Sequence, residues 1–357
     1  MSRERVARRI AAAAAYGGGG IGLLGVGFAG LLLTEAKLAE LQLNTLQGEP
    51  PRADGVYGEA FANAEGLAPL RMAVLGDSTA AGFGVDRGRD TPGALLAGGI
   101  AAMAERPVRL FVAAANGAAS NDLERQLALV LAAEPSPDVA LIMIGANDVT
   151  QRIKLADSVR MLSDTVRRLR AAGAEVIVGT CPDLGTIEPV RPPLRTIARR
   201  ASRQLAAAQT IGVVEAGGRS VSLGALLGPE FDHRPEMFAS DRYHPSAQGY
   251  QTAAMALLPS MCAALGVWPE EERADAFRGE GVLPVAQAAA EAAGRGGTEV
   301  AGAAIQGSES GPRGRWALLK HRRRRILPAE APAGAPAGPP GATSGNSHAV
   351  DADARAT

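Results

Sequence analysis

Short apolar runs alternate with longer segments of helical periodicity between Arg71 and about Gly266, and this alternation limits the fold more than any other feature of the chain. The predicted buried strands are Met72–Leu75, Val108–Ala114, Val139–Ile144 and Val176–Thr180, with Val213–Glu215 as a weaker fifth. Between them, segments such as Leu155–Ala172 repeat apolar residues every three or four positions, which is typical of a helix with one buried face. The pattern predicts an α/β fold in which helices cover both faces of a parallel sheet. Ligands of such folds bind where the strands end.

Two further helices are predicted within this region, one near its middle and one at its end. Asp122–Ala133 follows Ser120 and Asn121, either of which can serve as the helix cap. Ser246–Leu265 is predicted to be the closing helix of the domain.

The N-terminus has the pattern of a membrane segment. Four arginines, at positions 3, 5, 8 and 9, precede an uncharged run of 24 residues from Ile10 to Leu33, which is long enough as a helix to cross a bilayer. No positive excess follows the run, so the charge asymmetry predicts a cytoplasmic N-terminus and a single-pass anchor, with the rest of the chain outside the cytoplasm. A cleaved secretion signal and a segment without a membrane role are the alternatives. Glycines in this run also spell GxGxxG, but no strand precedes them, so no dinucleotide cofactor is predicted.

Composition excludes several classes of protein. Lys and Arg total 37, as do Asp and Glu, and this zero net charge argues against a nucleic-acid binder. The two cysteines, Cys181 and Cys262, are too few for a disulfide framework or a cysteine-rich zinc site, so no metal is predicted, and whether they pair stays open. The four histidines are His233, His244, His321 and His348. Because the last two lie in a tail-like region, any catalytic imidazole is His233 or His244.

The C-terminal part of the chain has no strong pattern. After Trp268 the periodicity weakens, although Val282–Ala293 could form one more short helix. The basic run Lys320–Arg325 precedes a tail rich in Pro, Ala and Gly, which is predicted to be disordered. The basic run is either a solvated surface segment or a contact for anionic polymers or lipid headgroups.

Residues suited to catalysis follow three of the predicted strands. Ser78 follows the first strand after Gly76 and Asp77, and its hydroxyl is expected to be exposed at the ligand-binding edge. Gly117 follows the second strand, and its amide can donate to a developing oxyanion. Asn147 follows the third strand, and its side-chain NH₂ can donate beside that amide. Each of these segments taken alone is also compatible with an ordinary turn.

A fourth segment supplies an acid and a base just before the closing helix. The spacing of Asp241 and His244 places both side chains on one face of a predicted helical turn, where the carboxylate can accept from one imidazole nitrogen and leave the other free as a base. His233 is the rival base, but its acidic neighbour Asp232 is adjacent in sequence, and adjacent side chains normally face away from each other.

Taken together, the four segments resemble the SGNH or GDSL family of serine hydrolases. The blocks are GDSTAAGFG at 76–84, NGAAS at 116–120, GAND at 145–148 and DRYH at 241–244, and the resemblance covers about Arg71–Gly266. It implies a three-layer α/β/α, flavodoxin-like fold and a serine esterase or lipase that needs no cofactor. It also implies a site in which Ser78 is the nucleophile, His244 the general base and Asp241 its orienting acid. The implied oxyanion hole consists of the Ser78 and Gly117 amides and the Asn147 side chain.

The sequence leaves the substrate and two other functions open. The expected substrate is a small-molecule, lipid or glycan ester, and a cell-surface glycan O-deacetylase or acyltransferase would use the same fold. A non-catalytic surface-binding module is the alternative from another class. The expected organisation is a basic segment at 1–9, an anchor at 10–33, a linker at 34–69, a hydrolase domain at 70–267, a loosely structured extension at 268–312 and a disordered tail at 313–357.

Overall fold

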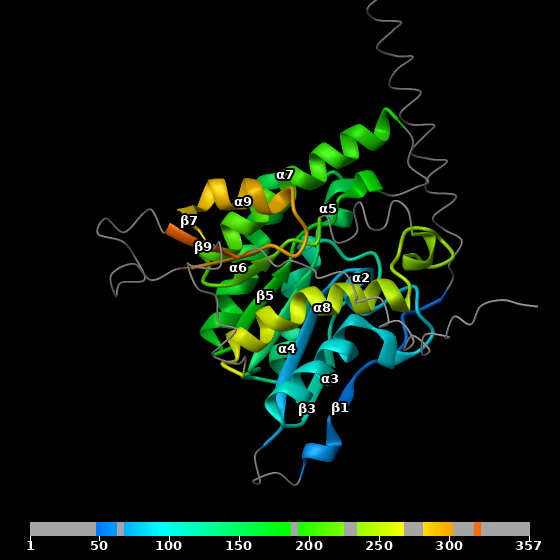
Figure 1. The fold of residues 1–357 in the computed structure, drawn as a ribbon, viewed down its shortest axis with the longest axis vertical. Coiled ribbons are helices and arrows are strands. Elements are labelled where there is room, and N and C mark those ends of the chain that lie inside the picture. The colour runs from blue at the N-terminus through cyan, green and yellow to red at the C-terminus, as the bar shows by residue number, and fades with distance from the viewer. Residues whose placement is uncertain are drawn as a thin grey trace, which may run out of the picture. The chain divides into compact units, whose positions relative to one another are not determined.

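A mixed β-sheet forms the centre of the protein, as seen in a computed structural model (Figure 1). The structure describes residues 48–62, 68–186, 192–224, 234–267, 281–302 and 318–322. Within these residues the sheet has nine strands in the order β1-β3-β2-β4-β5-β6-β8-β9-β7. Their bounds are β1 Gly55–Tyr57, β2 Leu70–Gly76, β3 Val108–Val112, β4 Val139–Met143, β5 Glu175–Gly179, β6 Arg219–Val221, β7 Gly281–Pro284, β8 Glu299–Gly302 and β9 Leu318–Arg322.

The five central strands run parallel and give the sheet its class. From β3 through β2, β4 and β5 to β6, every neighbouring pair is parallel. Counted along the parallel strands alone, the order is 2-1-3-4-5, which is the flavodoxin-like arrangement. Antiparallel strands are added at both edges: β1 beside β3, and β8, β9 and β7 beyond β6. The predicted α/β fold with a flavodoxin-like parallel sheet is confirmed.

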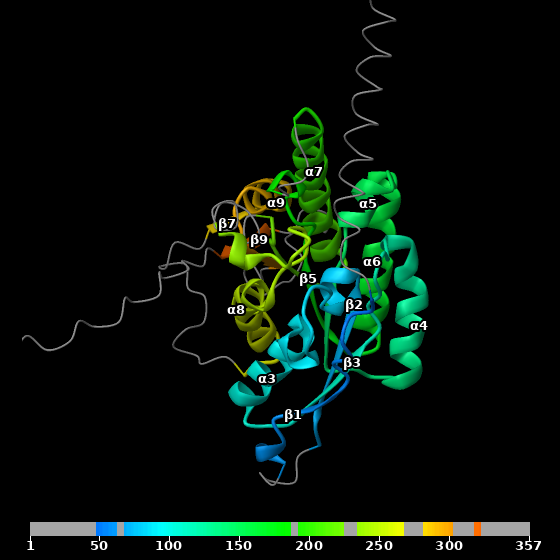
Figure 2. The same cartoon turned by 90° about the vertical axis from the view of Figure 1, so that its right-hand side faces the viewer.

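Helices cover both faces of the sheet because successive residues of each strand point to opposite sides (Figure 2). Met72 and Val74 of β2 belong to a core that includes residues of α3 (Pro92–Ala104) and α8 (Ala247–Ala264). Ala73 and Leu75 belong to a second core with α4 (Leu123–Ala133), α6 (Leu155–Ala171) and the end of α7 (Leu194–Glu215). The molecule therefore has three layers, α/β/α, in this region.

The central strands and most helices lie where the sequence predicts them, but the fifth strand does not. The prediction of a strand at Val213–Glu215 was wrong, because these residues form the last turn of α7, where Val213 and Val214 are buried. The fifth parallel strand is β6, Arg219–Val221, which contains one apolar residue and so has no strand signal of its own. Two adjacent β-branched residues are compatible with a buried helix face as well as with a strand.

The segment after residue 267 contributes to the sheet, whereas the sequence suggested a loose extension and a disordered tail. Here α9 (Val285–Ala293) follows β7, and its small alanine side chains pack beside Val214 of α7. On β8, the buried carboxylate of Glu299 accepts from Arg219 of β6 at 3.0 Å and from Ser260 of α8 at 2.8 Å. The strands β7 and β8 are short and contain glycine. Their pairing therefore depends on the neighbouring strands rather than on a sequence pattern of their own.

The N-terminal region is described only from residue 48. Residues 48–62, part of the predicted linker, contain β1 and a short 3-10 helix at Glu59–Phe61, and Asp54 accepts a hydrogen bond from the Val112 amide at 2.8 Å. Within the described ranges, none of the helices combines the length and apolar character needed to cross a membrane. The predicted anchor at 10–33, as well as His233 and His348, lies outside the described residues.

The two cysteines are not joined by a disulfide. Cys181 and Cys262 are both buried and belong to different apolar clusters. The question that the sequence left open is thereby answered for this structure.

Candidate active site

The turn that carries Ser78 begins where β2 ends. Gly76 has φ of 136°, and a Cβ at this position would overlap the carbonyl oxygen of Met143, so only glycine fits. Asp77 follows as the cap of the short helix α2 (Ser78–Ala81), because its carboxylate accepts from the Thr79 amide at 2.9 Å. Ser78 is therefore the first residue of a helix at the carboxyl edge of the sheet.

Ser78, His244 and Asp241 form one chain of hydrogen bonds. Ser78 Oγ lies 2.9 Å from His244 Nε2, and His244 Nδ1 lies 2.6 Å from Asp241 Oδ2. All three residues are buried, with exposed fractions of 6% for Ser78, 7% for His244 and 3% for Asp241. Side chains from segments 166 residues apart in sequence thus meet in the order hydroxyl, imidazole, carboxylate.

The segment that carries Asp241 and His244 is a turn, not the helical turn that the sequence predicts. Arg242 has φ of 54°, in the left-handed region, so the backbone does not follow a right-handed helix. The other oxygen of Asp241, Oδ1, accepts from the amides of Tyr243 and His244, at 3.0 Å each. This carboxylate therefore stabilises its own turn as well as orienting the imidazole.

Aromatic side chains enclose the imidazole on two sides. The rings of Phe83 and Tyr243 have centroids 4.7 and 4.6 Å from that of His244, tilted in the first case and edge-on in the second. Tyr250 of α8 is fully buried and donates a hydrogen bond to the Phe83 carbonyl at 2.7 Å. The imidazole thus packs against two aromatic rings, one of which is held by Tyr250 through its backbone.

Asp241 stays ionised despite its burial. Burial alone would raise the pKa of its carboxyl group, but the hydrogen bonds from the His244 side chain and the Tyr243 amide outweigh this, so its pKa lies below the ordinary value. A carboxylate at this position favours the tautomer in which Nδ1 carries the proton and Nε2 is free to accept one.

Gly117 and Asn147 follow the two strands that flank β2. Asn147 lies in the first turn of α5 (Ala146–Thr150), and its Nδ2 donates to the carbonyl oxygen of Ala118 at 2.8 Å. Gly117 has a positive φ of 75°, a backbone conformation that favours glycine. The hydrogen bond joins the turns after β3 and β4, and it uses one of the two N–H groups of the Asn147 amide.

Two carboxylates that the sequence analysis did not single out lie beneath these turns. Both oxygens of Asp148 accept from the Ser120 amide, at 3.3 and 3.2 Å, so Asp148 fixes the segment that follows Gly117. Burial of the Asp77 carboxyl group and the nearby charge of Asp148 together raise its pKa to about 7, and the hydrogen bond from the Thr79 amide opposes this shift. Asp77 precedes Ser78 and Asp148 follows Asn147 in the sequence. This proximity to predicted site residues is the one signal that could have pointed to them.

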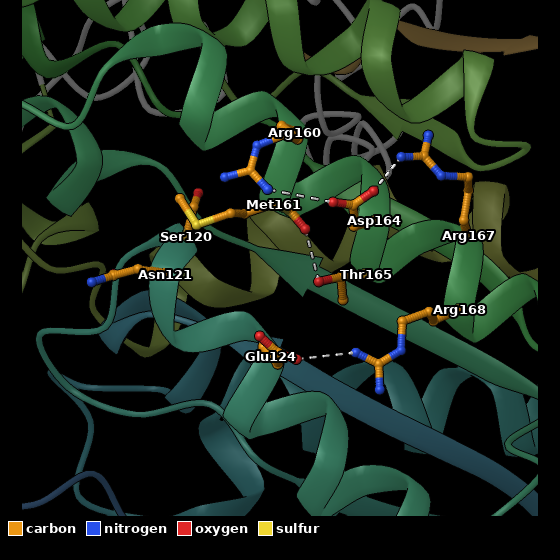
Figure 3. Close-up of a pocket in the computed structure, with 9 residues that line it drawn as sticks. All are labelled: Ser120, Asn121, Glu124, Arg160, Met161, Asp164, Thr165, Arg167 and Arg168. Atoms are coloured by element: carbon orange, nitrogen blue, oxygen red, sulfur yellow. Dashed lines mark hydrogen bonds and ion pairs between the residues drawn. The ribbon is translucent and has the colours of Figure 1, made fainter.

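A separate pocket lies between α4 and α6, on the outer side of that helix layer (Figure 3). Its volume is about 340 Å³, and its lining residues are Ser120, Asn121, Glu124, Arg160, Met161, Asp164, Thr165, Arg167 and Arg168. The charged side chains pair with one another: Arg168 lies 3.8 Å from Glu124, and Arg160 lies 3.8 Å from Asp164, which also pairs with Arg167. None of the predicted catalytic or oxyanion residues lines this pocket.

The site and the sheet together define a class of protein. A serine hydroxyl, an imidazole and a carboxylate joined in this order, at the carboxyl edge of a doubly wound sheet, are the arrangement of a serine hydrolase. Residues 74–252 match the model of the GDSL-like lipase/acylhydrolase family. A GDSL-like esterase of Mycobacterium tuberculosis is 43% identical over 235 residues, which cover 64% of this chain and 75% of the relative. The chain belongs to the GDSL-like lipase/acylhydrolase family and is a carboxylic ester hydrolase.

Two solved structures that overlap part of this chain are an esterase and a lipase. An acetylxylan esterase from Geobacillus stearothermophilus is 20% identical, with a TM-score of 0.43 over 55% of this chain and 94% of the other. An extracellular lipase from Streptomyces rimosus is 17% identical, with a TM-score of 0.40 over 54% of this chain and 99% of the other.

Proposed function

We propose that this chain hydrolyses carboxylic esters through an acyl-enzyme on Ser78. The observation that carries the proposal is the hydrogen-bonded chain from Asp241 through His244 to Ser78, with distances of 2.6 and 2.9 Å. In this proposal His244 is the general base and Asp241 orients it and stabilises its protonated form.

The proposed reaction has two halves. His244 Nε2 takes the proton of Ser78 while Oγ bonds to the ester carbonyl carbon, and the protonated imidazole then gives that proton to the departing alcohol oxygen as the C–O bond breaks. Water, deprotonated by the same nitrogen, attacks the acyl-enzyme and releases the acid, and the proton returns to Ser78. The Ser78–His244 pair ends each cycle in its starting state.

The proposed oxyanion hole uses three donors from three neighbouring turns. Two are the amides of Ser78 and Gly117, and the third is the Asn147 side chain. The Ser78 amide belongs to the first turn of α2 and so has no acceptor within that helix. The hydrogen bond from Asn147 to the Ala118 carbonyl supports this arrangement, because it ties the Asn147 turn to the Gly117 turn.

The substrate class and location are further parts of the proposal. The relative's description as an esterase supports an ester substrate of small-molecule, lipid or glycan type. The apolar run at 10–33 supports a single-pass anchor in the cell membrane with the catalytic domain outside the cytoplasm, with secretion as the alternative. Protease treatment of intact cells is expected to digest the domain, and protection of the domain until the cells are lysed would contradict this topology.

Hydrolysis of a p-nitrophenyl ester series from acetyl to palmitoyl tests the reaction, with the full chain and its Ser78→Ala variant. We expect Ser78→Ala to lower turnover by at least about 10⁴-fold and to abolish labelling by a fluorophosphonate probe. Ser163→Ala is the matched control, since Ser163 is also 6% exposed but lies on α6, away from His244.

Each outcome of this experiment separates the candidate functions. Wild-type-like hydrolysis by Ser78→Ala would contradict the proposed nucleophile. The optimal chain length distinguishes an acetyl esterase from a lipase, and transfer of the acyl group to an added glycan acceptor would indicate an acyltransferase. A folded wild-type protein that reacts with no ester and no probe would instead favour a surface-binding module.

A further inference from the structure

Two fully buried glutamines in the helix layer bond to the backbone at the edge of the sheet that carries the site. Gln126 belongs to α4 and Gln209 to α7, and both are 0% exposed. Both ends of each side-chain amide are paired with backbone groups. Burying an amide costs free energy unless its hydrogen bonds are made, and a leucine or methionine would fill a similar volume without that cost. These contacts, rather than core filling, are what a glutamine supplies at either position.

Gln126 holds the residue at which the nucleophile turn begins. The Gly76 amide donates to Gln126 Oε1 at 2.7 Å, and Gln126 Nε2 donates to the Gly76 carbonyl oxygen at 2.8 Å. Gly76 is two residues before Ser78, and its conformation sets the direction in which Asp77 and Ser78 leave the strand. Both backbone groups of this glycine are thereby fixed from a helix 50 residues further along the chain.

Gln209 holds the residues from which the Asn147 turn begins. The pairing of β4 with β5 ends at Met143 and Gly179. Beyond this point, Gln209 Nε2 donates to the Ile144 carbonyl oxygen at 2.9 Å, and Gln209 Oε1 accepts from the Cys181 amide at 2.8 Å. The glutamine amide therefore bridges the two strands where they separate, and it fixes the carbonyl group three residues before Asn147.

We propose that Gln126 and Gln209 are positioning residues for ester hydrolysis, Gln126 through the turn of Ser78 and Gln209 through the turn of Asn147. The inference rests on the catalytic roles proposed above for those two residues. A displacement of about 1 Å in a reacting group can cost on the order of 10²-fold in rate. Loss of either bridge frees one turn while leaving the hydrogen bonds between His244 and Asp241 in place.

The test for Gln126 compares an apolar and a polar replacement. We expect Gln126→Met to lower kcat by about 10- to 100-fold with KM changed less than about threefold, and to slow fluorophosphonate labelling by the same factor. Gln126→Glu keeps the shape of the side chain and the acceptor for the Gly76 amide, so we expect a smaller loss of kcat than in Gln126→Met. The glutamate variant also replaces Gln126→Met as the test if the methionine variant does not fold. Val130→Ala is the matched control, because Val130 is equally buried on α4 but its apolar side chain cannot make the hydrogen bonds to Gly76. It is expected to lower Tm and leave kcat within about twofold.

The test for Gln209 is a double-mutant cycle with Asn147. If Gln209 acts by placing the Asn147 side chain, Gln209→Met lowers kcat about tenfold in the wild-type background but by less than about twofold in the Asn147→Ala background. A residue that served only the stability of the domain would give the same factor in both backgrounds. Gln209→Glu is measured in parallel, because it keeps the acceptor for the Cys181 amide.

The outcomes separate this inference from the proposed function. Folded glutamine variants with wild-type kcat, or equal factors in the two backgrounds of the cycle, overturn the positioning roles while Ser78→Ala still tests the nucleophile. A wild-type protein that neither hydrolyses esters nor reacts with the probe overturns the proposed function itself. A loss of kcat in Val130→Ala equal to that in Gln126→Met, at equal Tm, assigns the effect to stability and also overturns the inference.

Discussion

The turn that carries Ser78 and the turn that carries Asn147 share one plan but are fixed by different means. Each begins with a glycine of nearly the same conformation, φ of 136° at Gly76 and 139° at Gly145, and continues into a short helix. Each is bonded from the helix layer by a buried glutamine. The two differ in what lies against the glycine.

The atoms that would meet a Cβ differ between the two glycines. A Cβ on Gly76 would overlap the carbonyl group of Met143 on the neighbouring strand, which cannot move without breaking the sheet. A Cβ on Gly145 would meet side chains instead: the Cβ of Cys181 at 2.8 Å, Nε2 of Gln209 at 3.0 Å and Sγ of Cys181 at 3.2 Å. The turn of Ser78 is therefore constrained by the backbone of the sheet, whereas the turn of Asn147 is constrained by two buried side chains, which can shift further than paired backbone.

The largest expected effect that follows from this difference is that of an added methyl group. We expect Gly76→Ala to destabilise the fold by about 4 kcal/mol or more and to abolish hydrolysis. The added Cβ would overlap backbone atoms, and alanine also disfavours the positive φ of this position. Gly145→Ala is expected to cost about 2 kcal/mol and to leave measurable activity. Urea unfolding and ester hydrolysis of both variants measure the contrast, and equal losses would show that the two turns are constrained alike.

The second effect concerns the proposed oxyanion donor, Asn147, in the turn that begins at Gly145. We expect Asn147→Ala to lower kcat by about 10²–10³-fold with little change in KM, since the donor acts on charge that develops in the transition state. Steady-state kinetics on p-nitrophenyl acetate measures it. Thr150→Ala is the control, because Thr150 is exposed on the same short helix and its hydroxyl donates to the Asn147 carbonyl oxygen at 3.2 Å, so this variant disturbs the turn without removing the Asn147 side-chain amide. A loss confined to KM would indicate that Asn147 binds the substrate rather than the transition state.

The parts of the fold that were predicted from the sequence are those whose signal is local. The four apolar runs correspond to four of the five central parallel strands, and glycine within two residues of a polar residue marks the strand ends where Ser78, Gly117 and Asn147 lie. The spacing from Asp241 to His244 predicted their contact, although the backbone between them is not helical. Parallel strands place their carboxyl ends at one edge, so local signals were enough to bring the site residues together. Their catalytic roles remain predictions.

The features that were not predicted depend on partners distant in sequence. Gln126 and Gln209 look like ordinary helix residues until the structure shows them bonded to Gly76 and Ile144, which are 50 and 65 residues away. The strands β7, β8 and β9 likewise lack a pattern of their own, and pairing with one another and with β6 accounts for them. Periodicity reports which face of an element is buried, but not which backbone groups a buried side chain will meet.

The smallest expected effect is a pH dependence that differs between carboxylates around the site. Asp77 keeps its proton in the folded state up to a pKa of about 7, above the ordinary value of 3.8, so the folded state binds more protons than the unfolded chain between these values. The free energy of unfolding therefore falls as pH rises from about 4 to 7, by on the order of 1–4 kcal/mol, and this dependence is lost in Asp77→Asn. Asp148→Asn removes one cause of the shift and is expected to move the pH range of this dependence to lower pH.

Asp241→Asn gives a pH dependence of the opposite sign. The pKa of Asp241 is lowered on folding, so the difference in the free energy of unfolding between the wild type and this variant grows as pH rises through about 4. Urea unfolding of the wild type and the three variants from pH 3 to pH 8 measures these slopes, and a wild-type curve parallel to that of Asp77→Asn would show that Asp77 is ionised throughout.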